Sequence, residues 1–230
     1  RRCQLWSEKG ALSGLRHEVR ARRRCDRGER RAVAVTSRVV AVRASEPEIT
    51  SDVLEAIPAG ARPEGLAFRM KSAGSLARKV ATRYQKNPNR SPQEHLNSMT
   101  DVVRYTIVSR NTDTVFSDAR EMASSLRKLG WTMVEADHSY TEGATYKGLH
   151  FLARHPSGET VEIQAHSEQS MAVKDKNHID YEVSRDLATP IADRVAANER
   201  MVARSATLRA PAGIQQAGEL GGVPLEVKNR

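Results

Sequence analysis

The sequence predicts an α+β or mixed α/β fold, and three of its features carry this prediction. Two alternating runs flank Pro156-Ser157-Gly158, which is typical of a β-hairpin. A run rich in β-branched residues at 101–108 predicts another strand. Runs with apolar residues every three or four positions lie on both sides of these strands and predict helices. We therefore expect one sheet flanked by helices.

Composition limits the class of protein and divides the chain. No apolar run approaches the roughly 18 residues that cross a bilayer, so we expect no membrane partner. The net charge of +9 comes from residues 1–44, which hold 13 Lys or Arg and only 4 Asp or Glu. This Arg-rich N-terminal segment is either a solvated arm or linker or a contact surface for nucleic acid. We expect a compact domain at 45–209 and a C-terminal tail at 210–230.

The expected domain opens with two helices. Thr50 or Ser51 can cap the first, which ends at Pro58. Ser72 can cap the second, whose apolar positions repeat every four residues: Leu76, Val80 and Tyr84. Pro and Asn then predict a loop at 88–92 before the strand at 101–108.

The rest of the chain alternates helices and strands. An amphipathic pattern predicts a helix over 113–129, and a strand follows at 131–136. Residues 137–147 are expected to form a loop with two exposed rings, Tyr140 and Tyr146. A helix over 168–182 places three side chains along one side: Lys174, His178 and Tyr181. Thr189-Pro190 begins the last helix, with a buried stripe of Ile191, Val195 and Val202.

The hairpin at 148–167 carries a dense group of polar side chains. Matching apolar residues sets its register and places six of them on one face: Leu149, Phe151, Ala153, Val161, Ile163 and Ala165. The other face then carries five polar residues: His150, Arg154, Glu162, Gln164 and His166. Such a face is either the solvated side of an antiparallel sheet or a functional site.

Residues 69–79 supply cations upstream of the hairpin. The start of a helix favours anions, so four residues there can hold a polyphosphate: Arg69, Lys71, Ser75 and Lys79. An ordinary basic helix face is the alternative. Magnesium-dependent phosphoryl transfer needs such cations together with carboxylates, which Asp101 and Glu162 can provide. The sequence contains no Walker-type loop, no Cys-x-x-Cys pair and no Gly-x-Ser-x-Gly motif.

Four ordered motifs resemble the synthetase domain of RelA/SpoT-type alarmone synthetases. They are Arg69-x-Lys71-x-x-x-Ser75-x-x-x-Lys79, Asp101-x-x-Arg104, Tyr146-Lys147-Gly148-Leu149-His150 and Glu162-Ile163-Gln164. The resemblance covers roughly residues 46–206. It implies a nucleotidyltransferase-like mixed β-sheet flanked by helices. It also implies transfer of the β,γ-pyrophosphate of ATP to the 3′-hydroxyl of a nucleotide, with release of AMP.

The resemblance implies roles for the matching residues. The ATP phosphates would be held by Arg69, Lys71, Ser75 and Lys79, with Arg104 assisting at the donor. The catalytic pair would be Asp101, which ligates Mg²⁺, and Glu162, which binds the metal or activates the 3′-hydroxyl. We assign four residues to the acceptor: Tyr146 stacking on its base, His150 beside its phosphate or ribose, and Gln164 and His166 in support. Lys174, His178 and Tyr181 resemble the family's downstream helix, where they serve either packing or ligand contact.

The chain departs from the family pattern at two places. Gly143-Ala144-Thr145 stands where the family has Lys-Asn-Gly, and His166-Ser167 stands where it has Arg-Thr. Both changes remove a cation, which leaves the usual GDP or GTP preference open. No hydrolase half is visible, so we expect the toxic branches of the family. The expected activity is a standalone pyrophosphokinase that makes (p)ppGpp- or (p)ppApp-type alarmones.

Two alternatives stay open. One changes the acceptor to the 3′ CCA end of tRNA, with the Arg-rich arm holding the RNA backbone. The other is a catalytically silent nucleotide- or RNA-binding module, which Asp101 and Glu162 argue against because carboxylates repel phosphates. A toxin of this kind implies action in the cytoplasm and a neutralising antitoxin or immunity protein. It also fits delivery as part of a larger secreted protein.

Overall fold

The structure is a computed structural model that describes residues 4–229, with the side chains of residues 28, 29 and 31–229. The chain forms two units. One combines the part of the chain before Ala44 with Ser72–Met99. The other combines Ala44–Lys71 with the chain from Thr100 onward. Each unit is described by itself.

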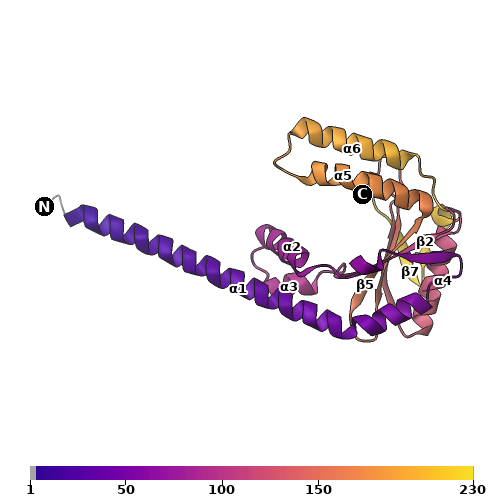
Figure 1. The fold of residues 1–230 in the computed structure, drawn as a ribbon, viewed down its shortest axis with the longest axis horizontal. Coiled ribbons are helices and arrows are strands. Elements are labelled where there is room, and N and C mark those ends of the chain that lie inside the picture. Colours follow the sequence, from indigo (N-terminus) through magenta and orange to yellow (C-terminus); the bar gives the residue numbers. More distant parts are fainter. Residues whose placement is uncertain (1–3, 230) are drawn as a thin grey trace. The chain divides into compact units, whose positions relative to one another are not determined.

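Helices and strands follow one another along residues 4–229 (Figure 1). The helices are α1 (Gln4–Glu55), α2 (Ala73–Lys86), α3 (Pro92–Asn97), α4 (Val115–Lys128), α5 (Glu168–Arg185) and α6 (Ile191–Ala206). The strands are β1 (Ala61–Glu64), β2 (Val103–Ser109), β3 (Thr132–His138), β4 (Leu149–Arg154), β5 (Thr160–Ser167), β6 (Glu219–Leu220) and β7 (Val223–Val227). Two 3₁₀ helices are η1 (Leu66–Phe68) and η2 (Ile214–Gln216). None of the described helices has the length and apolar character that crossing a bilayer requires.

Helix α1 is continuous where the sequence predicted an arm or linker over residues 1–44 and a separate helix capped near residue 50. It contains Pro47 without ending there. Thr50 is not a cap, because its hydroxyl donates to Glu46 one turn earlier and lies 2.6 Å from the Tyr105 hydroxyl. Two valines of α1 are largely exposed: Val33 and Val40. The expected boundary at residues 44 and 45 stays a prediction, since α1 passes through it.

The start of α2 confirms the predicted cap. The Ser72 side chain accepts a hydrogen bond from the Ser75 backbone N–H at 3.2 Å, which satisfies one of the free donors at the helix start. Leu76 and Val80 are buried, as the four-residue spacing predicted. The expected loop at 88–92 is shorter than predicted, because α3 begins at Pro92 with a capping box.

The second unit is built on a seven-stranded mixed sheet with the order β1-β2-β5-β4-β3-β7-β6. Strands β2 and β5 are parallel neighbours, and β4 pairs with β5 in the antiparallel sense. Helices α4 and α5 pack on the sheet, and α6 packs against α5 (Figure 1). This arrangement confirms the predicted α+β fold with a mixed sheet flanked by helices.

The hairpin has the predicted register. Its three apolar pairs are Leu149 with Ala165, Phe151 with Ile163 and Ala153 with Val161, and all six residues are buried. Gly158 forms the turn with a φ of 89°, a conformation that side chains disfavour. Because side chains alternate along a strand, the polar residues of the hairpin share the opposite face.

The chain after residue 210 differs from the expected tail. Strand β7 pairs parallel with β3, with Leu225 opposite Ala136. The Gln215 amide of η2 donates to the Tyr140 carbonyl at 3.3 Å. Tyr140 is therefore buried rather than exposed as predicted, and burial raises the pKa of its hydroxyl to about 12. Pro224 inside β7 hid this strand from sequence analysis, because proline is rare within strands.

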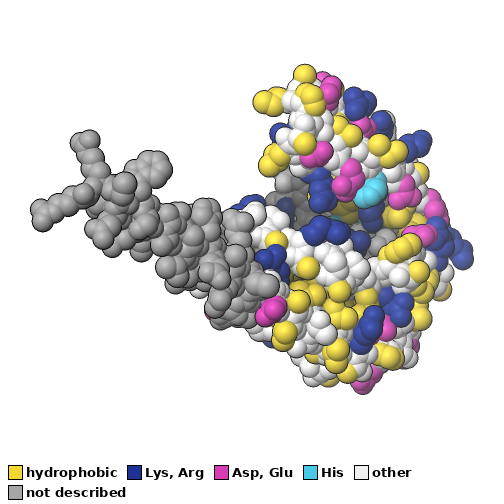
Figure 2. All heavy atoms as spheres, turned by 60° about the vertical axis from the view of Figure 1, so that its left-hand side comes forward, with side chains coloured by type: hydrophobic (Ala, Val, Ile, Leu, Met, Phe, Trp, Pro, Cys, Tyr) yellow, Lys and Arg dark blue, Asp and Glu magenta, His cyan; other side chains and the backbone are white. Residues whose placement is uncertain are grey.

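The buried stripe predicted on α6 is wrong. Ile191 is 76% exposed and Val195 is 51% exposed. The buried residues of helix α6 are instead Ala197, Met201 and Ser205. Asn177 of α5 stabilises packing through this face of α6. Its amide donates to the Met201 carbonyl at 3.3 Å and to the Ser205 hydroxyl at 3.2 Å. Hydrophobic side chains are consequently exposed on the α5–α6 pair, at the top of Figure 2.

Candidate functional site

Polar residues of three strands meet on one face of the sheet. Arg104 of β2 lies opposite Glu162 of the parallel strand β5. On the other side of β5, His150 of β4 lies opposite Gln164. Residues directly opposite one another on neighbouring strands point to the same face. The pairing of β2, β5 and β4 therefore brings together four of the residues that the sequence assigned to the site.

Glu162 is the centre of a hydrogen-bonded group. Its Oε1 lies 3.2 Å from His150 Nδ1 and accepts from Gln164 Nε2 at 2.8 Å. Burial by itself would raise the pKa of Glu162. The hydrogen bonds from His150 and Gln164, with the positive charges of His150 and Arg104, outweigh burial and lower this pKa to about 2. Glu162 is therefore ionised at neutral pH.

Tyr146 is held by two imidazoles. Its hydroxyl oxygen lies 2.7 Å from His150 Nε2 and 2.7 Å from His166 Nε2. Its ring meets both imidazoles edge to face, with centroid distances of 5.4 and 5.5 Å. The two imidazoles thus hold the Tyr146 hydroxyl in place. Tyr146 is half-buried, whereas the sequence predicted an exposed ring.

His166 lies behind Tyr146 and is fully buried. Its Nδ1 is 3.0 Å from the Ser170 hydroxyl of α5. Burial, followed by the positive charges of Lys174, His150 and Arg104, lowers the pKa of His166 well below its usual value. The sequence assigned His166 to the acceptor, but this position lets it act on an acceptor only through Tyr146. Nothing in the sequence pattern distinguished this buried position from a surface one.

The ionised Glu162 sets the direction of its hydrogen bond with His150. A carboxylate only accepts, so His150 donates to Glu162 from Nδ1. The Tyr146 hydroxyl has a single hydrogen and lies between Nε2 of His150 and Nε2 of His166. The Ser170 hydroxyl donates to the Ser167 carbonyl at 3.1 Å and lies 3.0 Å from Nδ1 of His166. These contacts link Glu162 to α5 through Tyr146 and the two imidazoles.

The buried His166 predicts acid-sensitive stability. Its folded-state pKa is depressed, so below the usual value of 6.5 the unfolded chain binds a proton that the folded chain does not. The free energy of unfolding should be highest above pH 6.5 and fall below it, by at most about 1.4 kcal/mol per pH unit for this one group. Urea unfolding between pH 5 and 7.5 measures this slope.

The matched variants for this prediction are His166→Gln and His138→Gln. Burial also lowers the pKa of His138, so both histidines contribute to the acid dependence. His166→Gln should flatten the slope, and His138→Gln should leave the His166 part in place. An unchanged slope in His166→Gln would contradict the assignment of a neutral, buried His166.

A second group of predicted residues lies beside the start of β2. The Arg104 N–H donates to the Arg69 carbonyl at 2.8 Å, and the Lys71 N–H donates to the Val102 carbonyl at 2.9 Å. This pairing extends the edge of the sheet along residues 69–71. The Lys71 Nζ atom lies 3.1 Å from Oδ2 of Asp101. Two residues from different predicted motifs thus form an ion pair next to the strand that carries Arg104.

Arg69 has a partner that sequence analysis missed. Its guanidinium pairs with Glu46 of α1, and this hydrogen bond raises the pKa of Arg69 and lowers that of Glu46. Glu46 also accepts from Thr50. No motif marks Glu46 in the sequence, because its role depends on where α1 meets the loop before β2.

Ser75 and Lys79 lie on α2, which belongs to the other unit. The Ser75 hydroxyl accepts from the Ser72 hydroxyl at 3.1 Å and from the Arg78 guanidinium at 3.0 Å. Both residues are half-buried. Their contact with ATP phosphates stays a prediction.

The side chains expected along one side of α5 separate in the structure. Lys174 turns to the sheet, where its Nζ donates to Gln164 Oε1 at 3.1 Å. His178 is exposed, and Tyr181 is 49% exposed with the Arg185 guanidinium 5.4 Å from its ring centroid. Of these three residues, Lys174 joins the candidate site.

Two carboxylates were expected to hold Mg²⁺, and they belong to different groups. Asp101 pairs with Lys71, whereas Glu162 pairs with His150 and Gln164. Within the described side chains, no three His, Cys, Asp or Glu residues form a ready metal site. Mg²⁺ usually binds one or two protein carboxylates together with substrate phosphates. These donors therefore fit Mg²⁺ as part of a complex with a bound nucleotide.

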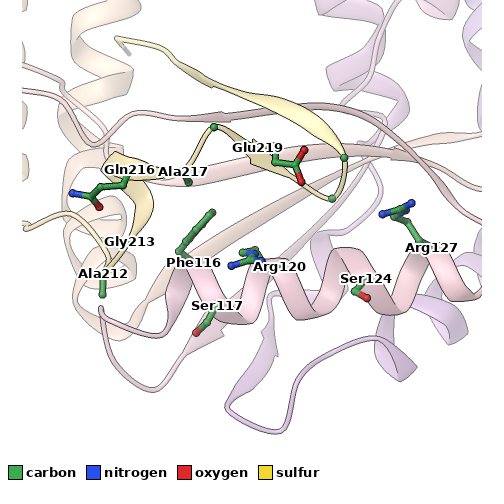
Figure 3. Close-up of a pocket in the computed structure, with 13 residues that line it drawn as sticks. Phe116, Ser117, Arg120, Ser124, Arg127, Ala212, Gly213, Gln216, Ala217 and Glu219 are labelled. Atoms are coloured by element: carbon green, nitrogen blue, oxygen red, sulfur yellow. The ribbon is translucent and has the colours of Figure 1, made fainter.

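A groove of about 630 Å³ lies away from this face, between α4 and residues 212–222 (Figure 3). Phe116, Arg120 and Arg127 line it from α4, and Glu219 lines it from the C-terminal segment. The residues around this groove include none of the predicted site residues. We therefore place the candidate site on the polar face of β2, β5 and β4.

Comparison with known structures finds similar chains. One is a chain in the crystal structure of the complex between the type VI effector Tas1 and its immunity protein. That chain is 20% identical in sequence and has a TM-score of 0.49, and the match covers 74% of this chain and 93% of that chain. Another is small alarmone synthetase 1 from Bacillus subtilis bound to its product pppGpp, with 18% identity, 64% and 71% coverage and a TM-score of 0.39.

A further structure of small alarmone synthetase 1 from Bacillus subtilis is 16% identical, with 78% of this chain and 91% of that chain covered and a TM-score of 0.40. The likeness to these structures is one of fold alone. No protein-family model and no curated protein sequence matches the chain.

Proposed function

We propose that the chain is an ATP-dependent pyrophosphokinase that transfers the β,γ-pyrophosphate of ATP to the 3′-hydroxyl of a purine nucleotide. The product would be a (p)ppGpp- or (p)ppApp-type alarmone. The observation that carries the proposal is the ionised Glu162 directly opposite Arg104 on neighbouring parallel strands. The motifs that contain these two residues are far apart in the sequence and adjacent in the fold, which supports a shared site.

The proposed reaction forms one bond and breaks one. The acceptor 3′-oxygen bonds to the β-phosphorus of ATP, and the bond from that phosphorus to the oxygen bridging the α-phosphate breaks. AMP leaves with the electron pair of the broken bond. Glu162 has a pKa of about 2 and is therefore a weak base. We therefore propose that Glu162 orients the 3′-hydroxyl by accepting a hydrogen bond from it. The proton of the 3′-hydroxyl then passes to phosphate oxygens or to water.

The other residues of the face would bind and neutralise. Arg104 is exposed beside Glu162 and would contact the phosphates of the donor. Mg²⁺ would be held by Asp101 and Glu162 with phosphate oxygens, where it neutralises phosphate charge. The acceptor base would stack on Tyr146, whose hydroxyl is fixed by His150 and His166.

Transfer of labelled phosphate tests the proposal. The chain is incubated with Mg²⁺ and γ-³²P-labelled ATP, alone or with AMP, ADP, GDP, GTP or bulk tRNA, and the products are separated by chromatography and on gels. Label in a mononucleotide, lost in Glu162→Gln, is the expected result. Transfer to none of these acceptors would contradict the proposal and favour a silent binding module.

The charge of residues 1–44 favours a second acceptor, the 3′ CCA end of tRNA. This segment has 13 Lys or Arg against 4 Asp or Glu, and such charge binds phosphate backbones with strong salt dependence. Two results together would replace the mononucleotide proposal. The label would move only to tRNA, and the affinity for tRNA would fall steeply between about 50 and 200 mM salt. About six or more phosphate contacts would cause such a fall.

We also propose that this activity inhibits growth and is neutralised by a partner protein. Controlled expression of the chain in bacterial cells, compared with Glu162→Gln, tests the first part. If Glu162→Gln arrests growth at the same protein level as the wild-type chain, toxicity does not depend on pyrophosphate transfer. This result would contradict the proposal.

A further inference from the structure

Lys174 is the cation that α5 places on the candidate site. Ser167 caps α5, and the helix then turns Ser170 and Lys174, one turn apart, toward the sheet. Ser170 lies 3.0 Å from His166, and the Lys174 Nζ atom donates to Oε1 of Gln164 at 3.1 Å. The helix cap therefore sets the position of Lys174 relative to the strand that carries Glu162.

Gln164 links Lys174 to Glu162. The Gln164 amide oxygen faces Lys174, and its amide nitrogen donates to Glu162 at 2.8 Å. An ammonium group only donates and a carboxylate only accepts, so the amide has one orientation that satisfies both neighbours. The two charged groups are held at opposite ends of one amide. Among the described residues, Gln164 is the hydrogen-bond acceptor of Lys174.

The charges around Lys174 favour an additional anion. Burial, followed by the charge of Arg104 on β2, lowers the pKa of Lys174 to about 8. The carboxylates of Asp175 on α5, Glu162 on β5 and Glu64 on β1 act in the opposite direction. Glu64 pairs with Arg62, and Glu162 is engaged by His150 and Gln164. The remaining titratable groups on this face of β4 and β5 are His150, Arg154 and His166.

We propose that Lys174 binds a phosphate group of the acceptor nucleotide. An ammonium group has three donors, and Gln164 takes one of them, so a phosphate oxygen can accept another. The inference rests on the proposed function, because it takes the anion to be the nucleotide that receives the pyrophosphate. Lys174 adds a positive charge from α5 beside the buried His166, whose pKa is lowered well below its usual value.

Three variants test this contact. Lys174→Met removes the charge and keeps an apolar stem, and Lys174→Arg keeps the charge. Lys176→Met is the matched control, because Lys176 is an exposed lysine of the same helix. Isothermal titration calorimetry measures the binding of GDP and ADP, and of guanosine and adenosine, with α,β-methylene-ATP at saturation in the donor site.

Lys174→Met should weaken GDP or ADP binding by about 10- to 100-fold, as expected for a lost charge-assisted hydrogen bond. Nucleoside binding and Lys176→Met should show no change. In the wild-type chain, nucleotide affinity should fall as pH rises above about 8, because Lys174 loses its proton. Lys174→Arg should bind nucleotide without this fall, since arginine stays charged.

Several results would overturn the inference. The first is an unchanged nucleotide affinity in Lys174→Met, and the second is an equal loss of affinity for nucleotide and nucleoside in this variant. The third is weaker binding of α,β-methylene-ATP alone by Lys174→Met, which would place Lys174 at the donor. If Lys174→Met does not fold, the pH profiles of the wild-type chain and Lys174→Arg decide. A parallel transfer assay separates the two proposals. Lys174-dependent binding without transfer contradicts only the proposed function, whereas transfer with Lys174-independent binding contradicts only this inference.

Discussion

Glu162→Gln should lower the rate of pyrophosphate transfer by about 10²-fold, because the 3′-hydroxyl loses the group that orients it. The substitution keeps the shape of the side chain and removes the negative charge that His150, Gln164 and Arg104 stabilise. A neutral amide binds Mg²⁺ poorly and no longer requires His150 Nδ1 to donate toward it. Initial rates at saturating ATP and acceptor measure the effect.

The control for this variant is Glu142→Gln, which neutralises an exposed carboxylate outside the polar face. It should transfer pyrophosphate at the wild-type rate. Circular dichroism should show both variants folded. A Glu162→Gln chain that keeps more than about a tenth of the wild-type rate would show that Glu162 does not have the catalytic role proposed for it.

Gly148→Ala should disrupt the position of Tyr146. An added Cβ at residue 148 would lie 2.5 Å from the Tyr146 hydroxyl oxygen and 2.9 Å from Cε1 of His166. The backbone cannot easily move away, because the Gly148 N–H donates to the Ser139 hydroxyl at 3.1 Å and the Gly148 carbonyl accepts from the Ser139 N–H at 3.0 Å. We expect the free energy of unfolding to fall by about 1–3 kcal/mol, together with loss of acceptor binding.

Urea unfolding and GDP titration measure the two effects of Gly148→Ala. Gly218→Ala is the matched control, because a Cβ added at Gly218 meets no described atom within 4 Å. Equal stability of the two variants would mean that Tyr146 and His166 yield to the added methyl group. The interlocked geometry described for the site would then be wrong.

The polar face was predictable because it follows from local patterns. Alternation in the hairpin is enough to pair Leu149 with Ala165, and that pairing alone places His150 and Glu162 on the same face. The neighbouring position of Arg104 was not predictable from periodicity, because the parallel pairing of β2 with β5 joins segments far apart in the chain. The motif resemblance indicated a shared site, and the pairing explains how the two strands form it.

The errors lie where one element covers another. Tyr140 was expected at the surface because its own neighbours are polar, but residues of the C-terminal segment contact it. Ile191 was expected in the core because it begins an apolar stripe, but α6 packs through the face that meets the Asn177 amide. Glu46 has no local signal, since its partner Arg69 comes from another part of the chain. Such contacts depend on tertiary packing, which periodicity does not report.

The parallel pairing of β2 and β5 also determines when activity can arise during synthesis. The ribosome makes Arg104 first, and α4, β3 and β4 must follow before Glu162 is made and can lie beside it. A nascent chain that stops before β5 has the strand with Arg104 and no carboxylate opposite it. Pairing of distant segments is also slow compared with hairpin formation. The proposed activity could therefore arise only after most of the domain has left the ribosome.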